Sequence, residues 1–355
     1  MKKYGVLGVM LILSLLVVLL FSFFGKKVKS TAIQVESPSM KDISTGTYVS
    51  PISIDYLRTL NIQSDGVKIE QELPNGSNYK RYIASYTSEG NKVYGLLTIP
   101  SASAPDGGFP AIVFCHGYIP PTQYVTTESY VAYVDYLARN GFVVFKIDYR
   151  GNGLSEGDAS GSYFSSAYTI DAISALKSLQ KFEMVNPERI GMWGHSMAGN
   201  VVLRAMEVSG EIKAGVIWSG AVYSYKDFAT YGIHDTSYTH KPDTTKEGIA
   251  QKDREISPEI QKIRTDPQSI DFNDPFWTSI SLTKNIKYLV SPLQINQATS
   301  DPVVNISYSR DLAQVLKDSG KKYEFYEYAG GGHNISSPYF EIAMERTAKF
   351  FKDNL

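Results

Sequence analysis

The sequence has little that would cross-link the chain or hold an inorganic group. Its 355 residues include one cysteine, Cys115, so no disulfide can form within the chain. Its His, Cys and carboxylate residues show no clustering at metal-ligand spacing, and there is no glycine-rich phosphate loop. We therefore expect no metal ion and no cofactor, and any chemistry should be carried out by the protein's own groups.

An excess of charge of one sign is lacking as well. The chain has 35 Lys and Arg against 36 Asp and Glu, a net charge of −1. Proteins that bind nucleic acids usually carry a basic surface, so this balance argues against a nucleic-acid partner. Internal repeats are absent too, which excludes a solenoid. The length allows one large domain with a sizeable core, and nothing in the composition indicates an oligomeric state.

One long apolar run is present, at residues 4–25, directly after Lys2 and Lys3. As a helix rising about 1.5 Å per residue, it could cross a hydrocarbon core of about 30 Å. Signal-peptide cores are shorter, about 7–15 residues, and end at a small-residue cleavage site that is not evident here. We predict a transmembrane anchor over 4–25, a linker over 26–50 and an extracytoplasmic domain over 51–355. A cleaved signal and a secreted domain are the alternative.

Buried strands and helices alternate through much of this domain. Residues 67–72 and 79–99 alternate as antiparallel edge strands, with a hairpin turn at 88–91. A continuous apolar run predicts a strand buried on both faces at 111–114, and further strands are expected at 142–147, 190–193, 214–218, 289–295 and 323–328. Helices are expected at 127–139, 167–182 (amphipathic), from 197 through 201–208, at 308–318 and at 339–352. This pattern predicts an α/β fold with a mostly parallel sheet, and the polar, aromatic segment 223–284 is expected to form an inserted helical cap.

A serine lies at the turn between one of these strands and the next helix. Residues 190–200 are predicted to form strand, turn and helix, with Ser196 at the tip of the turn. Such a turn exposes the hydroxyl above a sheet and points the next backbone N–H toward the group it attacks. Gly194 fits this nucleophile-elbow pattern, whereas Ala198 replaces its second glycine. Alone the match is weak, because a serine in this place can also cap a helix.

Two later loops supply an acid and a base. A serine nucleophile needs a neighbouring base, and the base needs a carboxylate that fixes its tautomer. Asp301 follows the predicted strand at 289–295, and His333 follows the strand at 323–328 in a glycine-rich loop. Each could be an ordinary turn residue on its own. The chain order and the strand-end positions together predict Ser196 as nucleophile, Asp301 as acid and His333 as base.

The oxyanion formed by such chemistry needs preorganised donors. We expect the backbone N–H groups of Met197 and Tyr118 to form this oxyanion hole, with Gly117 allowing the loop to turn toward the site. His116 is expected to be a hydrogen-bonded structural residue of that loop. His195 is expected to pack under the elbow.

These motifs together resemble the α/β-hydrolases, and within them the catalytic domain of the prolyl oligopeptidase-like (S9) serine hydrolases. The matching pieces are His116-Gly117, Asp148-x-Arg150-Gly151-x-Gly153-x-Ser155, Gly194-x-Ser196, Asp301-x-Val303-Val304 and Gly332-His333-Asn334. The resemblance covers residues 67–355. It implies an α/β-hydrolase fold, a twisted sheet with helices on both faces, and the triad Ser196, Asp301 and His333. Residues 148–155 are expected to form an internally hydrogen-bonded loop that braces the site.

Some residues depart from the family pattern. Ala198 and Ala298 stand where the family often has glycine, and residues 115–116 look like the backbone-only oxyanion loop of esterases. S9-type peptidase and carboxylesterase activities therefore both remain open. An acyltransferase with the same triad and a non-catalytic binding scaffold are further alternatives.

We predict a serine hydrolase that cleaves an ester or short peptide bond through an acyl-enzyme intermediate. Most aromatic residues of 223–284 are expected to pack the cap onto the domain, and a few to line an apolar substrate pocket beside Ser196. Carboxylates in this segment show no distinctive spacing for anchoring a free amine, so small uncharged acyl esters should be preferred over peptides with a free N-terminus.

Overall fold

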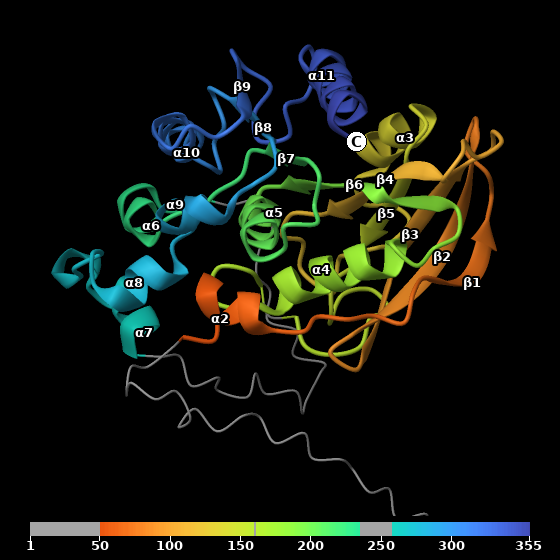
Figure 1. The fold of residues 1–355 in the computed structure, drawn as a ribbon. Coiled ribbons are helices and arrows are strands. Elements are labelled where there is room, and N and C mark those ends of the chain that lie inside the picture. Colours follow the sequence, from red (N-terminus) through yellow and green to blue (C-terminus); the bar gives the residue numbers. More distant parts are fainter. Residues whose placement is uncertain (1–49, 160, 235–257) are drawn as a thin grey trace, which may run out of the picture. The chain divides into compact units, whose positions relative to one another are not determined.

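The described part of the chain is built on a nine-stranded sheet (Figure 1). The computed structural model describes residues 50–159, 161–234 and 258–355. The predicted anchor and nearly all of the predicted linker lie outside these residues. Among the helices that are described, none is long and apolar enough to cross a membrane.

The strand order is β1-β2-β3-β5-β4-β6-β7-β8-β9. The strands are β1 (Lys68–Leu73), β2 (Tyr79–Ser88), β3 (Asn91–Pro100), β4 (Phe109–Cys115), β5 (Val143–Ile147), β6 (Val185–His195), β7 (Gly215–Trp218), β8 (Leu293–Ala298) and β9 (Tyr323–Tyr328). Neighbours from β1 to β5 pair antiparallel, and those from β5 to β9 pair parallel. The predicted hairpin is confirmed, and the exposed edge strand β1 carries a register shift between Ile69 and Gln71.

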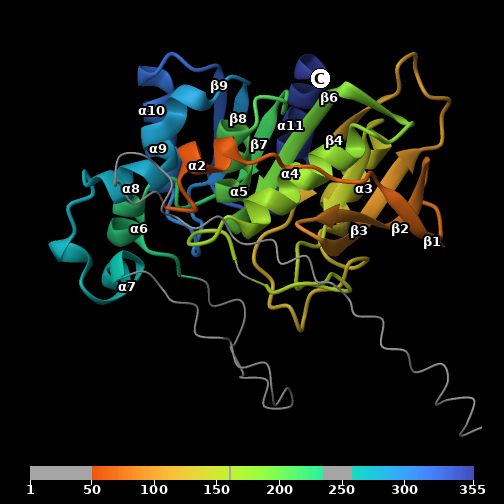
Figure 2. The same cartoon turned by 60° about the horizontal axis from the view of Figure 1, so that its bottom comes forward.

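Helices cover both faces of the sheet. They are α2 (Ile54–Thr59), α3 (Val131–Arg139), α4 (Ala167–Leu179), α5 (Met197–Val208), α6 (Tyr225–Tyr231), α7 (Pro258–Thr265), α8 (Pro275–Ile280), α9 (Leu282–Asn285), α10 (Ser307–Asp318) and α11 (Phe340–Asn354), with short 3-10 turns at Pro267–Ser269 and Ile286–Tyr288. α3 and α11 pack on one face, and α4 and α5 pack on the other, as Figures 1 and 2 show. Each face has its own apolar core, because the side chains of a strand point alternately to the two sides.

Several predicted elements differ from the structure, among them α3 and β8. α3 begins at Val131 and not at 127, because Lys146 takes the carbonyls of Thr126 and Ser129 as acceptors. β8 begins later than predicted, at Leu293, directly after Pro292, which has no N–H for a ladder.

α4 was predicted to be amphipathic, and this is wrong, because almost all of its residues are buried. The chain before β1 covers its outer side. There, Ser178 donates a hydrogen bond to Ser64, and the neighbouring Lys181 side chain donates to the Ser64 carbonyl.

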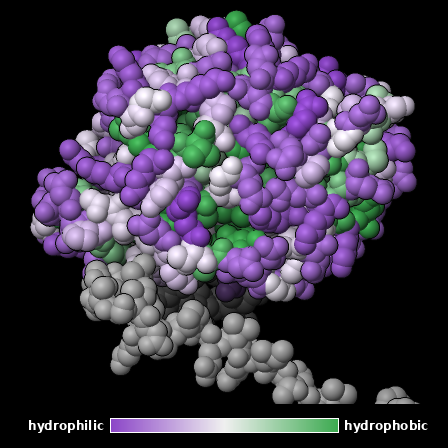
Figure 3. Space-filling view, viewed as in Figure 1, coloured by the Kyte–Doolittle hydropathy of each residue, from purple (hydrophilic) through white to green (hydrophobic). Residues whose placement is uncertain are grey.

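The inserted segment forms α6 to α9 in its described part, at the side of the molecule near α10 (Figure 1). Tyr223, Tyr225 and Trp277 are buried, so these aromatic residues pack the cap onto the core. Residues 235–257 lie outside the described part of the chain. On the face drawn in Figure 3, hydrophobic residues are interspersed among hydrophilic ones.

Candidate active site

Ser196 occupies a strained turn between β6 and α5. Its φ of 56° and ψ of −121° are uncommon for a residue with a side chain, and such strain is concentrated at functional sites. The turn is held by the Ser196 N–H, which donates to the Trp218 carbonyl at 2.9 Å. The side chain is half-buried, as a nucleophile exposed above a sheet requires.

Small residues allow β6 and α5 to pass close together at this turn. A Cβ on Gly194 would lie 2.6 Å from the Ala198 carbonyl oxygen, which is closer than packed atoms can approach. Ala198 itself is fully buried in the core. Farther along α5, a Cβ on Gly199 would lie 2.6 Å from the Gly220 Cα. At Gly199 the close neighbour of α5 is the loop after β7, whereas Ala198 is accommodated in the core in place of the expected glycine.

Asp301 and His333 are hydrogen-bonded to each other. The Asp301 Oδ2 lies 2.8 Å from the His333 Nδ1, and the Asp301 side chain is fully buried. Burial raises the pKa of Asp301. The hydrogen bond and charge of His333, together with the N–H groups of Val304 and Val303, lower this pKa by more than burial raises it, so the net pKa lies below the ordinary value of 3.8. A charged carboxylate beside Nδ1 keeps the proton on that nitrogen and leaves Nε2 free to act as a base.

Topology brings the three predicted residues to one edge of the sheet. Ser196 follows β6, Asp301 follows β8 and His333 follows β9, and these strands are parallel. The carboxyl ends of parallel strands meet at the same edge, where ligands of open α/β sheets bind. In addition, His195 Nε2 lies 2.9 Å from the His333 carbonyl oxygen, so the base loop touches the elbow directly.

The two predicted oxyanion donors lie on segments next to Ser196. Met197 is the first residue of α5, where backbone N–H groups have no partner within the helix. Tyr118 follows Gly117, whose Cβ, if present, would lie 3.1 Å from the Ser196 Cβ. The loop after β4 therefore passes against the serine, as a second donor would require.

The other predicted histidine roles are partly confirmed. His116 is buried beside the Gly117 and Asp148 carbonyls and stacks on Tyr124, and burial lowers its pKa to about 4. This supports a structural role. His195 packs at the elbow but also makes directed hydrogen bonds, one of them to Tyr130. Neither those bonds nor Tyr130 was predicted, because no local sequence signal links positions so far apart.

The loop after β5 is braced mainly by bonds to other elements. The Arg150 guanidinium donates to the fully buried Asp171 of α4 at 2.7 Å and to Glu89 at 2.8 Å. Asp148 accepts hydrogen bonds from Tyr124 and Thr126. The expected internal hydrogen bonds are also present, because the Asn152 side-chain amide donates to the Arg150 carbonyl and the Ser155 N–H donates to the Asn152 carbonyl.

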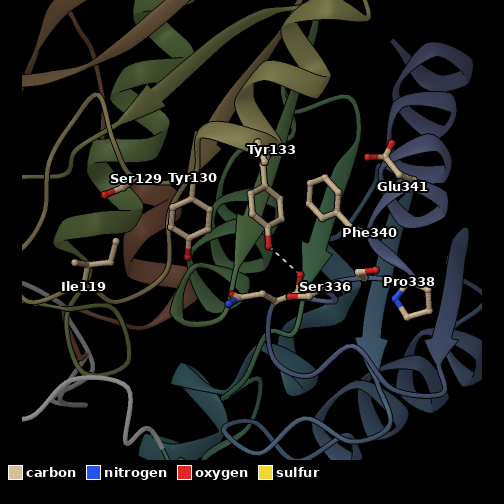
Figure 4. Close-up of a pocket in the computed structure, with 11 residues that line it drawn as sticks. Ile119, Ser129, Tyr130, Tyr133, Ser336, Pro338, Phe340 and Glu341 are labelled. Carbon is tan, nitrogen blue, oxygen red and sulfur yellow. Dashed lines mark hydrogen bonds between the residues drawn. The ribbon is translucent and has the colours of Figure 1, made fainter.

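A cavity of about 700 Å³ opens beside the base loop (Figure 4). Residues from the start of α3, the loop after His333 and the start of α11 line it: Ile119, Ser129, Tyr130, Ala132, Tyr133, Asn334, Ser336, Ser337, Pro338, Phe340 and Glu341. Tyr130 and Tyr133 point the same way from α3, and Phe340 lies beside Tyr133 in Figure 4. Glu341 is the one charged residue of this lining. None of the described residues of the inserted segment 223–284 lines this cavity, and the pocket predicted beside Ser196 stays a prediction.

Within the described residues, no group of three or more His, Cys, Asp or Glu side chains could hold a metal ion. Cys115 is buried at the end of β4, and burial raises the pKa of its thiol to about 12. The thiol is therefore unsuited to act as a nucleophile at neutral pH.

Known proteins with similar sequences are described as peptidases. The family described as "Serine aminopeptidase, S33" matches residues 109–241. The uncharacterized peptidase YtmA of Bacillus subtilis (strain 168) is 26% identical over 266 residues, which are 74% of this chain and 90% of that protein.

Solved structures share the fold. The acylaminoacyl peptidase of Pyrococcus horikoshii has a TM-score of 0.60 and 19% identity, over 79% of this chain and 42% of that one. Acetyl xylan esterase 1 from Thermoanaerobacterium sp. JW/SL YS485 has a TM-score of 0.58 and 16% identity, over 84% of this chain and 90% of that one. The chain thus spans less than half of the archaeal peptidase but most of the esterase.

Proposed function

Because this chain is a hydrolase of the α/β-hydrolase fold that resembles the S9 peptidases, we propose that it cleaves small esters or short peptides through Ser196, His333 and Asp301. The observation that carries the proposal is the 2.8 Å hydrogen bond between Asp301 and His333, at the sheet edge that also presents the strained Ser196.

The reaction follows from the chemistry of these groups. The Ser196 Oγ attacks the substrate carbonyl, and its proton passes to the His333 Nε2. The imidazolium that forms is stabilised by Asp301 through the Nδ1–H. The Met197 and Tyr118 N–H groups would stabilise the oxyanion, and each such donor is worth about 10²–10³ in rate.

The tetrahedral intermediate then collapses. The leaving group departs with the proton from His333 and leaves an acyl-Ser196 ester. Water, deprotonated by the same imidazole, attacks this ester and releases the acid. The two steps together consume one water molecule and regenerate the free serine and the neutral imidazole, with no cofactor.

A covalent probe tests the nucleophile. We expect a fluorophosphonate to label the wild-type chain and the Ser196→Ala variant to lose both labelling and turnover. Ser209→Ala, at the other end of α5, is the matched control and should label like wild type. Labelling that persists in Ser196→Ala, with peptide mapping to another residue, would contradict the assignment.

Ester hydrolysis is the first candidate activity. The cavity beside the base loop has three aromatic rings and suits a small, uncharged group. We expect a higher kcat/KM for a p-nitrophenyl ester of a short fatty acid than for an aminoacyl or dipeptidyl nitroanilide. Aryl esters are intrinsically more reactive, so an amide rate equal to or above the ester rate would favour a peptidase.

Peptide hydrolysis is the second candidate, and Glu341 favours it. Its carboxylate is exposed at the start of α11 and lines the cavity next to aromatic rings, a combination that can bind a substrate ammonium. If it does so, Glu341→Gln should raise KM for an aminoacyl nitroanilide and leave the p-nitrophenyl ester unaffected. Glu345→Gln, one turn farther along α11, is the control. Equal KM changes for both substrates would remove this candidate.

A further inference from the structure

A chain of hydrogen bonds connects the oxyanion loop to the base loop. The Gly117 N–H lies 2.9 Å from the hydroxyl oxygen of Tyr130, which lies 2.7 Å from the His195 Nδ1. The opposite ring nitrogen of His195, Nε2, lies 2.9 Å from the His333 carbonyl oxygen. Hydrogen bonds thus join the loop after β4 to the residue before α3, that residue to the end of β6, and the end of β6 to the loop that carries the base.

The chemistry of the groups fixes the direction of every bond. Burial, and then the charge of His333, lower the pKa of His195 to about 3, so its ring is neutral at neutral pH. A carbonyl can only accept, so the proton must sit on Nε2. Nδ1 is then an acceptor, and the Tyr130 hydroxyl must donate to it. The hydroxyl oxygen in turn accepts from the Gly117 N–H.

The backbone conformation of Tyr130 sets where its hydroxyl lies. Tyr130 precedes α3 with a φ of 60°, a left-handed conformation that costs free energy for a residue other than glycine. The ammonium of Lys146, whose side chain is fully buried, holds the preceding segment through the carbonyls of Thr126 and Ser129, at 2.7 and 2.9 Å. A strained residue persists only where its surroundings hold it in this way.

A second hydrogen bond, from α3 itself, reaches the base loop. The Tyr133 hydroxyl donates to the Asn334 carbonyl at 2.8 Å (Figure 4). Tyr130, just before α3, and Tyr133, within α3, point the same way in Figure 4. Two successive carbonyls of the base loop are therefore held, that of His333 by His195 and that of Asn334 by Tyr133.

We propose that Tyr130 and His195 are positioning residues, which set the oxyanion loop and the His333 backbone at a fixed separation around Ser196. This inference rests on the proposed function of Ser196 and His333. Neither residue is the base, because the His195 Nε2 faces a carbonyl and its Nδ1 faces a hydroxyl. The Tyr130 bond also draws the Gly117 N–H away from the substrate, which leaves the next N–H, of Tyr118, to face it.

Kinetics of matched variants test this. In full-length protein, Tyr130→Phe should lower kcat and the rate of fluorophosphonate labelling on the order of 10-fold to 100-fold. This loss is smaller than that for removing a direct oxyanion donor, and KM should stay within about 3-fold of the wild-type value. Tyr136→Phe removes a hydroxyl from the same helix without touching these bonds and should match wild type. Thermal melting checks that each variant is folded.

Two replacements of His195 separate positioning from packing. In His195→Gln the amide nitrogen can still donate to the His333 carbonyl and its oxygen can still accept from Tyr130. In His195→Phe only the ring shape remains. We expect Gln to retain at least about 10-fold more activity than Phe, by analogy with the loss for Tyr130→Phe. A packing role gives the reverse order and would overturn the proposal.

The tautomer provides a readout that needs no activity. In ¹⁵N-histidine-labelled protein, the signals lost in His195→Gln should be those of a neutral ring protonated at Nε2, at any pH where the protein is folded above about pH 5. Protonation at Nδ1 would overturn the proposal. So would wild-type rates in Tyr130→Phe while wild type still labels at Ser196. If wild type does not label at all, the proposed function fails, and the tautomer alone decides whether the bond chain exists.

Discussion

Asp301 is held by more hydrogen bonds than its contact with His333. Its Oδ1 accepts from the N–H groups of Val303 and Val304, at 2.8 and 3.0 Å, and its Oδ2 also accepts from Gln297 at 2.8 Å. These bonds fix the carboxylate whether or not a substrate is present. Because its pKa is depressed below 3.8, its ionic contribution to stability is present above that pH and is lost as the pH falls through the folded-state value.

We predict that Asp301→Asn lowers kcat by about 10⁴ and leaves the fold intact. The amide oxygen can still accept from the two backbone N–H groups, but the amide no longer fixes the tautomer of His333. Turnover of a p-nitrophenyl ester and a thermal melt measure the two effects. If activity survives, another carboxylate orients His333, and the assignment of Asp301 is wrong.

Glu207 is a buried carboxyl group without a hydrogen-bond partner among the described residues. It lies in α5, and both of its carboxyl oxygens are buried. Burial raises its pKa well above the ordinary value of 4.5, although the charges of Arg204 and Lys321 act in the opposite direction. The folded state therefore binds this proton more tightly than the unfolded chain does. Its contribution to stability is complete below about pH 4.5 and falls as the pH rises toward the folded-state pKa.

The corresponding prediction concerns Glu207→Gln. This variant should be about as stable as wild type near pH 4.5 and more stable at higher pH. The difference should grow by at most about 1.4 kcal/mol per pH unit. Urea unfolding at several pH values measures it. Glu211→Gln is a control of opposite sign, because Lys177 and Gln180 outweigh burial and lower the pKa of Glu211. A pH-independent difference for Glu207→Gln would contradict the prediction.

At the scale of elements, one ion pair ties the loop after β5 to α4. Asp171 is fully buried, and Arg150 binds it through both the Nε and an Nη atom. Removing one partner of a buried pair leaves an uncompensated charge. The loop and the helix should therefore depend on each other strongly.

We predict that Arg150→Ala lowers the free energy of unfolding by about 3–5 kcal/mol. Arg139→Ala, which breaks a half-exposed pair with Asp135 on α3, should cost about 0.3–0.5 kcal/mol. Denaturant unfolding of the two variants gives the comparison. Similar losses in both would show that the buried pair does not connect the two elements as described.

The elements that sequence predicts well are those with a strong local pattern. The run at 111–114 lies within β4, and β9 has the predicted bounds, because apolar or alternating side chains determine both strands. The close approach of Asp301 and His333 could be anticipated because strand ends share an edge. The start of α3 could not, because a left-handed Tyr130 has no local signal and depends on Lys146. The bond between His195 and the His333 backbone spans 138 positions, and only the folded chain brings them together.

At the scale of the whole molecule, we predict that the full chain is held at a membrane by residues 4–25. The protein should sediment with membranes and resist carbonate extraction. The double variant Leu16→Arg, Val18→Arg should bind the membrane more weakly, because each central arginine costs about 2.5–3.5 kcal/mol on insertion. Cell fractionation measures the distribution, with conservative Leu16→Ile and Val18→Ile as the control. N-terminal sequencing that finds a mature chain beginning after the apolar run would show a cleaved signal and contradict the anchor.

The edge strand β1 affects how copies of the molecule behave when crowded. All but one of its residues are exposed, Lys68, Glu70 and Glu72 carry charge, and its register shifts between Ile69 and Gln71. An open sheet edge is a template for another strand, and charges with a bulge are the means by which proteins prevent such pairing. Two copies meeting at this edge would have to desolvate charged side chains across an uneven ladder. The protein can therefore reach high local density without its sheets fusing into aggregates.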